Sequence, residues 1–528
     1  MSARGSTMHF DVVIAGGGFA GAYCARTLGK GFSRAEGERR FALVAERNVL
    51  IFQPMLAEVA GSSLSPIDVV NPLRQFCRGV NVLQGTIQKI DWESRSLILD
   101  GGRYTRDHKV TFGQLVLALG SITNLRAIPG MEEYGWPMKN VSDALRLRAA
   151  LINRLEEASL SEDAEVRRRL LTFVVVGGGY TGVETAGQML DFVHQVHRFY
   201  TNLKGSPIRV VLVHSQPELL GEIGPELGAY ARRVLTDRGV EFMLNRKVAA
   251  VTASRVMLED GSAIEANTTV TTIGNAANPV VTDLCKQLGI SAPKGRVPTD
   301  ECLRVQGADG LWAAGDGAAV PWDDKGTRKV SPQTAQFAFR QGELLGANLC
   351  RVLSGSAPRP FRYRYMGQLA TIGERAAVAE IFGMHFKGFV AWWMWRTIYL
   401  AKLPGIVRKL RVVIDWTFDL IFPRDISQIM PAPIDVVRTI HLEKDETLFV
   451  QGAPSRGIFY IRQGSIVLST KGLPDRKVGA GSLLDQAEMD SSNTWESTAT
   501  ALEPSDLLVF RGRLVEHLRK DLRLVRRN

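Results

Sequence analysis

The feature that most constrains this chain is a glycine turn between an apolar run and a helix start, at Phe173–Met189 (FVVVGGGYTGVETAGQM). The run before the turn is short and β-branched, as expected for a buried parallel strand. Gly177, Gly179 and Gly182 follow at GxGxxG spacing. In such a turn the first glycine permits the bend, the second lets a pyrophosphate approach, and the third lets the helix pack on its strand. A glycine-rich loop of an ordinary α/β domain is the alternative.

A second unit of the same kind stands upstream, at Phe10–Cys24 (FDVVIAGGGFAGAYC). Gly16, Gly18 and Gly21 occupy the corresponding positions. Two such units in one chain predict two nucleotides, bound so that their reactive rings meet.

A third segment, Gly310–Ala318 (GLWAAGDGA), strengthens this interpretation. Its short apolar run ends in Gly315 and Asp316, and a carboxylate at a strand end can hold the ribityl hydroxyls of a flavin. Together the three segments resemble flavoproteins with two dinucleotide-binding domains, with FAD in the first and NAD(P)H in the second.

An acidic residue, Glu46, follows the apolar strand predicted at Phe41–Val44. At this position an acid commonly binds the ribose hydroxyls of the adenosine, although a solvated surface carboxylate is the alternative. The spacing from the glycine turn exceeds the usual ~20 residues. We attribute the difference to an extended loop at Gly31–Arg40 (GFSRAEGERR).

Composition narrows the class of protein. The 528 residues predict roughly three to four domains at ~150 residues each. The net charge of +11 suits an anionic partner, either nucleic acid or an acidic membrane surface. No apolar signal core or run of ~18 apolar residues is present. The five cysteines are Cys24, Cys77, Cys285, Cys302 and Cys350. They form no CxxC pair, which argues against a dithiol–disulfide reductase and against a metal site.

The stretch after Glu46 resembles the type II NADH:quinone oxidoreductases, single-chain NADH dehydrogenases that do not pump protons. The resemblance covers roughly residues 8–430, in motifs that keep their order and spacing. It implies that Gln53, Pro54, Gly120 and Ala335 contact the flavin cofactor. The matching motifs are Asn48–Leu56 (NVLIFQPML), Leu115–Asn124 (LVLALGSITN), Ile128–Gly130 (IPG), Gly182–Glu184 (GVE), Thr334–Gly342 (TAQFAFRQG) and Gly367–Gly383 (GQLATIGERAAVAEIFG).

The same resemblance implies three catalytic residues. Glu184 would lie beside the nicotinamide and the flavin, although a first-turn glutamate is also favoured by the helix dipole. In the family, two glutamines of an AQxAxQ helix line the quinone slot; here they correspond to Gln336 and Arg340. The arginine would admit a more polar quinone or block the slot. Gln341 cannot replace the second glutamine because it points about 100° away on the helix.

The end of the second nucleotide-binding strand departs from the family pattern. His214 and Ser215 stand where family members usually carry an acid for the adenosine ribose. A neutral strand end removes the repulsion of a 2′-phosphate, yet no arginine is present to bind one. NADH is therefore expected, with NADPH possible.

The stretch Phe386–Met430 is basic, aromatic and amphipathic, and is interrupted by Pro404. We interpret it as an in-plane membrane anchor. Arg408, Lys409 and Arg411 are expected to meet anionic lipid. A dimer interface or a helix docked on the core is the alternative. One apolar face is expected to carry Ile406, Leu410, Val413, Thr417 and Leu420.

Beyond Pro431–Pro433, a predicted linker, the pattern changes to short alternating strands. Leu448–Gly464 resembles cyclic-nucleotide-binding domains, and Arg511–Arg527 would form the closing helix. The phosphate cassette departs from that pattern: Asp485 and Gln486 stand at its turn, and Trp495, beside Glu496, replaces the arginine that pairs with the phosphate. We therefore expect no cyclic AMP or cyclic GMP binding, and a scaffold for dimerisation, docking or another ligand.

The prediction is an α/β protein with two Rossmann-like dinucleotide-binding domains, an amphipathic helical membrane-associating segment and a C-terminal β-roll. The FAD domain would comprise 8–136 and 276–360, the NAD(P)H domain 137–275, the membrane segment 361–430 and the β-roll 431–528. Hydride would pass from NADH to FAD, and two electrons to a membrane quinone without proton pumping. A soluble flavoprotein reductase with another acceptor, or a slow redox-responsive regulator, is the alternative.

We expect a peripheral protein on the cytoplasmic side of the cell membrane. Its expected partners are the quinone, the anionic membrane surface and a second copy of the chain in a homodimer. No nucleic acid and no metal are expected.

Overall fold

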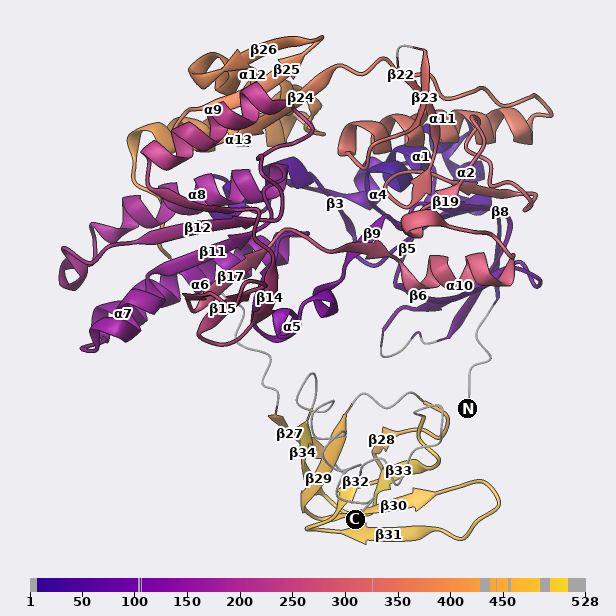
Figure 1. Cartoon of the computed structure of the whole chain (residues 1–528). Helices are drawn as coiled ribbons and strands as arrows, with labels where there is room; N and C mark the ends of the chain where they lie inside the picture. Colours follow the sequence, from indigo (N-terminus) through magenta and orange to yellow (C-terminus); the bar gives the residue numbers. More distant parts are fainter. Residues whose placement is uncertain are drawn as a thin grey trace. The chain divides into compact units, whose positions relative to one another are not determined.

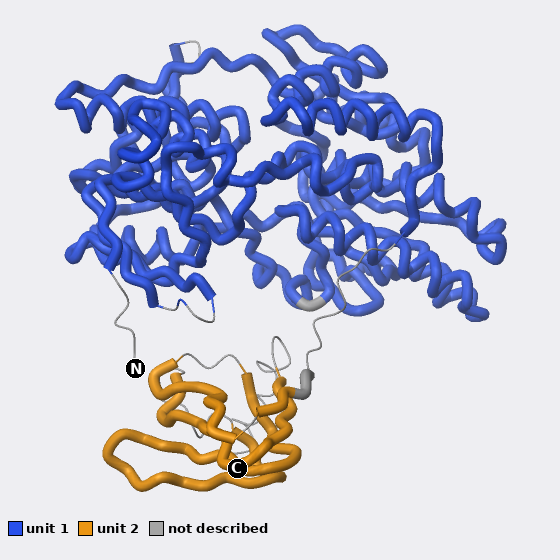
Figure 2. The backbone as a smooth tube through the Cα atoms, turned by 180° about the vertical axis from the view of Figure 1, so that it is seen from behind, with its two compact units in different colours: residues 1–428 blue, residues 429–528 orange. Residues whose placement is uncertain are grey.

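The computed structural model divides the chain into two compact units, residues 1–428 and residues 429–528 (Figure 2). The first unit holds both glycine turns, and the second holds the C-terminal strands. The four segments expected within residues 8–430 join in one unit, so their boundaries stay predictions. The structure describes residues 7–102, 105, 107–324, 326–427, 437–442, 444–453, 457–484 and 494–510.

The first glycine turn follows a central strand of a seven-stranded sheet (Figure 1). The strands of this sheet are β1 (Met8–Ala15), β2 (Phe41–Ala45), β5 (Asn81–Gln84), β6 (Thr86–Asp91), β7 (Ser96–Asp100), β8 (His108–Leu117) and β20 (Leu311–Ala313). Their order is β5–β2–β1–β8–β7–β6, and β20 pairs with the end of β8. Because β1 and β20 both run parallel to β8, the glycine turn and Asp316 lie at the same edge of the sheet.

The second glycine turn follows the central strand of a five-stranded, fully parallel sheet. Its strands, in spatial order, are β10 (Gly135–Pro137), β17 (Thr268–Thr271), β11 (Thr172–Val176), β12 (Arg209–His214) and β13 (Val240–Leu244). All five residues of β11 are buried. The apolar run before the turn is therefore the buried parallel strand predicted from the sequence.

Two crossing segments connect the two sheets. The chain leaves the first sheet through β9 (Ser121–Thr123) and returns through β18 (Asn275–Ala277), and these strands pair antiparallel. In Figure 1, β9 lies between the two sheets. The pairing holds the two nucleotide-binding parts against each other within the first unit.

The polar segment after the first helix is a helix and not the extended loop expected from the sequence. Residues Arg34–Arg40 form α2, and the Ser33 hydroxyl caps it by accepting from the Glu36 N–H at 3.3 Å. Two i,i+4 ion pairs, Arg34–Glu38 and Glu36–Arg40, support the short helix. These local pairs explain why a stretch without apolar periodicity still folds as a helix.

Helix α1 (Phe19–Lys30) packs along α11 (Ala335–Leu353) through small residues. A Cβ on Gly342 would lie 2.2 Å from the Ala20 carbonyl oxygen, and one on Gly346 would lie 2.5 Å from that of Cys24. This contact fixes Ala335 and Gln336, at the start of α11, near the start of α1.

The segment after α11 forms a small sheet and two helices. These elements are β24 (Gly367–Thr371), β25 (Ala377–Ile381), β26 (Met384–Lys387), α12 (Gly388–Lys402) and α13 (Ile406–Ile421). Trp395 and Trp416 are buried and face each other, with ring centroids 6.3 Å apart. Within the described ranges, no helix has both the length and the apolar character needed to cross a membrane.

The second unit contains two four-stranded antiparallel sheets. One is β27 (Val437–Leu442), β34 (Ser505–Phe510), β29 (Ile458–Gln463) and β32 (Leu483–Leu484); the other is β28 (Thr447–Phe449), β33 (Thr498–Ala501), β30 (Ser465–Ser469) and β31 (Arg476–Gly479). Trp495 is in their core, stacked on Phe449 with centroids 3.8 Å apart. The predicted linker Pro431–Pro433, Asp485, Gln486 and the tail Arg511–Arg527 lie outside the described residues.

Candidate active site

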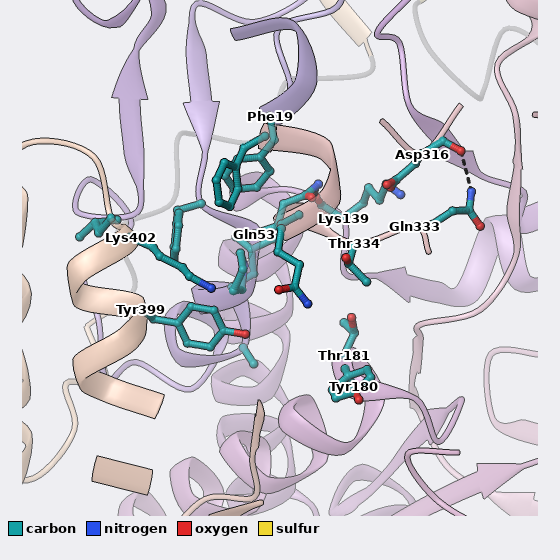
Figure 3. Close-up of a pocket in the computed structure, with 18 of the residues that line it drawn as sticks. Phe19, Gln53, Lys139, Tyr180, Thr181, Asp316, Gln333, Thr334, Tyr399 and Lys402 are labelled. Carbon is teal, nitrogen blue, oxygen red and sulfur yellow. Dashed lines mark hydrogen bonds between the residues drawn. The ribbon is translucent and has the colours of Figure 1, made fainter. Parts of the chain in front are cut away.

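One cavity of about 1080 Å³ joins the two nucleotide-binding parts of the first unit. Its wall includes Phe19 from α1, Tyr180 and Thr181 from α8 (Tyr180–His197), and Tyr399 and Lys402 from α12. Figure 3 shows these side chains converging on one space from separate helices. Both glycine-turn regions and the segment predicted to be a membrane anchor thus line the same cavity.

The two glycine turns have the same steric design. In the first, a Cβ on Gly16 would lie 2.2 Å from the Ala118 oxygen, and one on Gly21 would lie 1.8 Å from the Gly16 oxygen. A Cβ on Gly18, by contrast, would meet nothing within 4 Å. Gly18 is the N-cap of α1 and provides no side-chain cap to its first N–H groups. Open space at a helix N-terminus fits a pyrophosphate.

The second turn repeats these relations. A Cβ on Gly177 would lie 2.5 Å from Thr272 Oγ1, one on Gly182 would lie 1.9 Å from the Gly177 oxygen, and one on Gly179 would meet nothing within 4 Å. Gly179 is the N-cap of α8 and again provides no side-chain cap. The chain therefore has two cradles that fit two dinucleotides.

Asp316 follows β20 and faces the cavity near Lys139 (Figure 3). Burial raises the pKa of its carboxyl, while the positive charges of Lys139 and Arg296 lower it. The Gln333 amide donates to the Asp316 backbone oxygen at 2.8 Å. The Gly315 N–H donates to Oε1 of buried Gln341 at 2.8 Å. Gln341 thus supports the flavin-side turn and does not face the cavity.

Gln53 and Pro54 line the cavity from a 3₁₀ turn, Gln53–Met55. The Gln53 amide donates to the Lys139 backbone oxygen at 3.2 Å, and Lys139 Nζ donates to Ser121 Oγ at 3.0 Å. Ala335 also lines the cavity, at the start of α11. These contacts bring together residues that the family resemblance placed along the flavin.

Glu46 and Gly120 are not among the residues that line the cavity, although the Gly120 oxygen lies 3.0 Å from where a Cβ on Gly317, next to Asp316, would be. Glu46 is exposed just past β2, and Gly120 follows β8 with φ +64°. Both follow the carboxyl ends of parallel strands, and their contacts with FAD stay predictions.

Glu184 lines the cavity from the second turn of α8, one residue beyond the first turn in which the sequence placed it, and is 8% exposed. Its Oε1 accepts from the Thr371 N–H at 3.2 Å. Burial raises the pKa of Glu184 to about 8, the Thr371 N–H opposes this, and the charge of Glu58 raises it further. A carboxyl in this range can exchange a proton near neutral pH.

Glu58 is a second buried acid, on α3 (Leu56–Ala60), that sequence reasoning missed. Burial raises its pKa to about 7, and Arg396 acts in the opposite direction. Its Oε2 has no hydrogen-bond partner within the described part of the chain. No sequence pattern marked it, because it sits in an otherwise apolar helix turn.

Gln336 lines the cavity and is held at both ends of its amide. Its Nε2 donates to the Gly367 oxygen at 3.1 Å, and its Oε1 accepts from the Tyr363 hydroxyl at 3.0 Å. Tyr399 and Lys402, both on α12, also line the cavity. Sequence reasoning did not select them, because their segment was interpreted only as a membrane anchor.

Arg340 lies beside the cavity and is not one of the residues that line it. Its guanidinium lies 4.5 Å from the Tyr363 ring centroid and 5.1 Å from that of Phe339. Burial lowers the pKa of Lys402, and the positive charge of Arg340 lowers it further. A role for Arg340 in acceptor binding stays a prediction, and its position favours an effect through Lys402.

His214 ends β12 beside the second glycine turn. Its Nδ1 accepts from the Gly178 N–H at 3.1 Å, and burial lowers the pKa of the imidazole. The side chain therefore supports the turn as a neutral group. It supplies no carboxylate for the adenosine ribose.

Comparisons with known protein families match nearly the whole chain. The pyridine nucleotide-disulphide oxidoreductase model matches residues 10–342, the NDH2 C-terminal domain residues 365–425, and the cyclic nucleotide-binding domain residues 439–521. A Mycobacterium tuberculosis protein, type II NADH:quinone oxidoreductase Ndh, is 31% identical over 78% of this chain and 88% of its own length. The chain belongs to the type II NADH:quinone oxidoreductase family.

Other relatives agree with this assignment. An internal alternative NAD(P)H-ubiquinone oxidoreductase of Solanum tuberosum is 30% identical over 73% of this chain and 82% of its own length. The solved structure of NDH2 from Plasmodium falciparum in complex with NADH shares the fold, with a TM-score of 0.72 and 19% identity over 79% of this chain and 99% of that one. The family, fold class and nucleotide cofactors predicted from the sequence are thus confirmed.

Proposed function

We propose that this chain is an FAD-dependent NADH dehydrogenase that reduces a quinone at a membrane surface without pumping protons. The observation that carries the proposal is the single cavity, whose wall includes Gly179 and Glu184 on the nucleotide side, Asp316 on the flavin side, and Lys402 at the acceptor end. Family membership supports the same reaction.

When bound, FAD would supply the redox chemistry of hydride and two-electron transfer between NADH and the quinone. The chain's residues would bind and orient the reactants. The Asp316 carboxylate would accept hydrogen bonds from the flavin side chain, and the two glycine turns would bind the pyrophosphates. Glu184 holds a proton near the nicotinamide, and Gln336 and Lys402 position the acceptor.

A rapid-mixing experiment tests this proposal. Under anaerobic conditions, NADH should bleach the yellow holoenzyme, and a short-chain quinone should restore its colour quickly. Fast bleaching with slow recovery by quinone, and fast recovery with another acceptor, would favour the flavoprotein reductase reading instead.

The membrane surface is proposed on a set of exposed apolar side chains from two consecutive helices, which we call the α12–α13 face. All ten of its members are 43–70% exposed, and apolar side chains that gather on an exposed surface mark a binding or membrane site. The patch lies on the two consecutive helices of the NDH2 C-terminal domain match. The α12–α13 face comprises Phe389, Val390, Trp393, Ile406, Val407, Leu410, Val413, Ile414, Phe418 and Ile421.

The basic residues that are expected to meet anionic lipid also contact groups of the protein itself, and their binding to lipid stays a prediction. Arg408 Nε donates to the Val70 carbonyl oxygen, and Lys409 Nζ donates to that of Ala401 at 2.8 Å. Arg411 lies 3.9 Å from Asp68. The periodicity of a helix shows which residues share a face, but not which face packs on the protein.

Replacing Leu410 and Ile414 by serine should release the protein from lipid vesicles. Burying an apolar side chain of this size is worth roughly 1.5–3 kcal/mol, so the double variant should bind at least roughly tenfold more weakly in a vesicle co-sedimentation assay. Because both side chains are exposed, the fold should be preserved. Leu160→Ser, at another exposed leucine, is the control. Unchanged vesicle binding together with loss of a dimer would assign the α12–α13 face to self-association.

We also propose a homodimer, a position on the cytoplasmic side of the cell membrane, and a scaffold role for the second unit. The family model matched at residues 439–521 is that of cyclic nucleotide-binding domains. Trp495 fills the position expected for the phosphate-binding arginine and is 2% exposed, stacked in the core. A phosphate there would lack the charge-assisted hydrogen bonds on which such a site depends.

Calorimetry on the full chain should therefore show no binding of cyclic AMP or cyclic GMP, with a Kd weaker than about 1 mM. Trp495→Phe, which keeps an aromatic core, should behave like the parent protein. Micromolar binding of either nucleotide would refute the proposal and indicate a nucleotide-regulated dehydrogenase.

A further inference from the structure

One part of the cavity wall extends along α1, away from the glycine turn. We call it the α1 arm; it is formed by Tyr23, Arg26, Lys30, Phe76, Arg78 and Lys409. On α1, Phe19 and the first three of these residues follow at spacings of four, three and four, which places them on one helix face. Lys30 is eleven residues beyond Phe19, or about 16 Å along the axis. The α1 arm therefore reaches well beyond the pyrophosphate cradle at Gly18.

The floor of the α1 arm is aromatic. The ring of Tyr23 lies 5.2 Å from that of Phe76 and 5.3 Å from that of Phe339, measured between centroids. The Arg26 guanidinium lies over the Phe76 ring at 4.9 Å. This packing holds one cation in a fixed place at the cavity wall.

The walls of the α1 arm are strongly cationic. Arg26, Lys30, Arg78 and Lys409 contribute four positive charges, and Glu343 of α11 is the one acid that faces them from the described lining residues. No carboxylate in the described ranges forms an ion pair with Arg26, Lys30 or Arg78. Lys409 Nζ is held by the Ala401 oxygen. Four cations that face a single carboxylate leave an excess of positive charge, which favours an anionic ligand.

The α1 arm borders the exposed α12–α13 face. Pro404 and Gly405, in the turn between α12 and α13, line the cavity. The neighbouring residues Ile406, Val407 and Leu410 are exposed and belong to the α12–α13 face. The Arg408 contact with Val70 fixes the start of α13 near the strand that leads into Phe76. A ligand there would meet cations at one end and exposed apolar side chains at the other.

We propose that the α1 arm binds the head group of an anionic phospholipid. Its phosphate contacts Arg26, Arg78 and Lys409, and its acyl chains continue over Val407 and Leu410. The proposal rests on the membrane association of the proposed function and adds a discrete lipid site to it. A zwitterionic lipid lacks the net charge that the uncompensated cations select.

Calorimetry on the FAD-loaded full chain tests the site with soluble probes. The probes are dihexanoyl phosphatidylglycerol and dihexanoyl phosphatidylcholine, below their micelle concentrations, and glycerol 3-phosphate. The anionic lipid should bind more tightly than both others. Each basic residue near a membrane surface contributes about fivefold in affinity, so Arg26→Gln with Arg78→Gln should weaken binding of the anionic lipid roughly 25-fold.

Two further variants make the result specific. Arg74 is an exposed arginine in the helical turn Leu73–Phe76, which also contains Phe76, but it does not line the cavity. Arg74→Gln should therefore leave the affinity unchanged. Arg26→Lys with Arg78→Lys keeps both charges and should restore most of the binding, which controls for misfolding.

Equal affinity for the two lipids would overturn the proposal, as would equal affinity for glycerol 3-phosphate, which would indicate a free-phosphate site. An effect of Arg74→Gln as large as that of Arg26→Gln would also overturn it, because general surface charge would then suffice. Leu410→Ser with Ile414→Ser should reduce vesicle binding more than binding of the soluble anionic lipid. A failure of the membrane proposal is therefore distinguishable from a failure of the lipid site.

Discussion

Replacing Asp316 by alanine should leave the purified protein largely without flavin. Asp316 follows β20 at the cavity, where its carboxylate is placed to accept hydrogen bonds from the ribityl hydroxyls. Hydrogen bonds to a charged acceptor are worth roughly 1.5–3 kcal/mol, which corresponds to a roughly 10- to 150-fold weaker FAD affinity. The ratio of flavin to protein absorbance after purification measures the loss.

The half-buried cations near Asp316 make a structural control necessary. Lys139 and Arg296 both interact electrostatically with this carboxylate. Its removal therefore also deprives two positive charges of a nearby negative charge. Asp316→Asn keeps the shape and should retain more flavin than Asp316→Ala. Asp309→Ala, at an exposed aspartate just before β20, should retain all of it. Normal flavin occupancy in Asp316→Ala would remove this residue from the cofactor site.

The glycine turns could be predicted from sequence because their steric requirements are local. Gly21 must lack a Cβ because the Gly16 oxygen is 1.8 Å from where that atom would be, and Gly182 stands in the same relation to Gly177. Each requirement joins residues only five positions apart. Spacing alone therefore carries the information, and the strand before each turn is marked by its apolar run.

The other residues of the site come from separate segments that only the fold brings together. Lys139 follows β10, Lys402 ends α12 and Glu58 lies on α3, yet each is near a residue predicted for catalysis or cofactor binding. Nothing in their local sequence requires chemistry. Their positions depend on the packing of α3, α8 and α12, which a spacing rule does not describe.

Replacing Glu184 by glutamine should slow quinone reduction and flatten its pH profile. Because burial raises the pKa of Glu184 to about 8, the group holds its proton below that pH and loses it above. A positioned proton donor contributes roughly 10²- to 10⁴-fold to rate, so turnover should fall by at least roughly 10²-fold. In the parent enzyme the rate should decline above pH about 8. Steady-state kinetics between pH 6 and 10 measures both effects.

The coupling to Glu58 provides a second readout for the same assignment. The negative charge of Glu58 raises the pKa of Glu184, so Glu58→Gln should move the alkaline decline of the rate to lower pH. Glu165→Gln, at an exposed glutamate on α7 (Ala164–Leu170), should leave the profile unchanged. A profile that is identical in the parent enzyme and Glu184→Gln would exclude a proton-carrying role.

The Glu184→Gln variant should be more stable than the parent protein, although it should be less active. The folded-state pKa of Glu184 lies above its unfolded value, so the parent protein loses stability as the pH rises from about 4.5 to about 8. This loss corresponds to at most about 5 kcal/mol, and glutamine, which does not ionise, avoids it. Glu184→Gln should therefore have a higher Tm than the parent at pH 8, and the difference should shrink on acidification. A variant that is slower and also less stable at pH 8 would show that Glu184 is needed for packing instead of proton transfer.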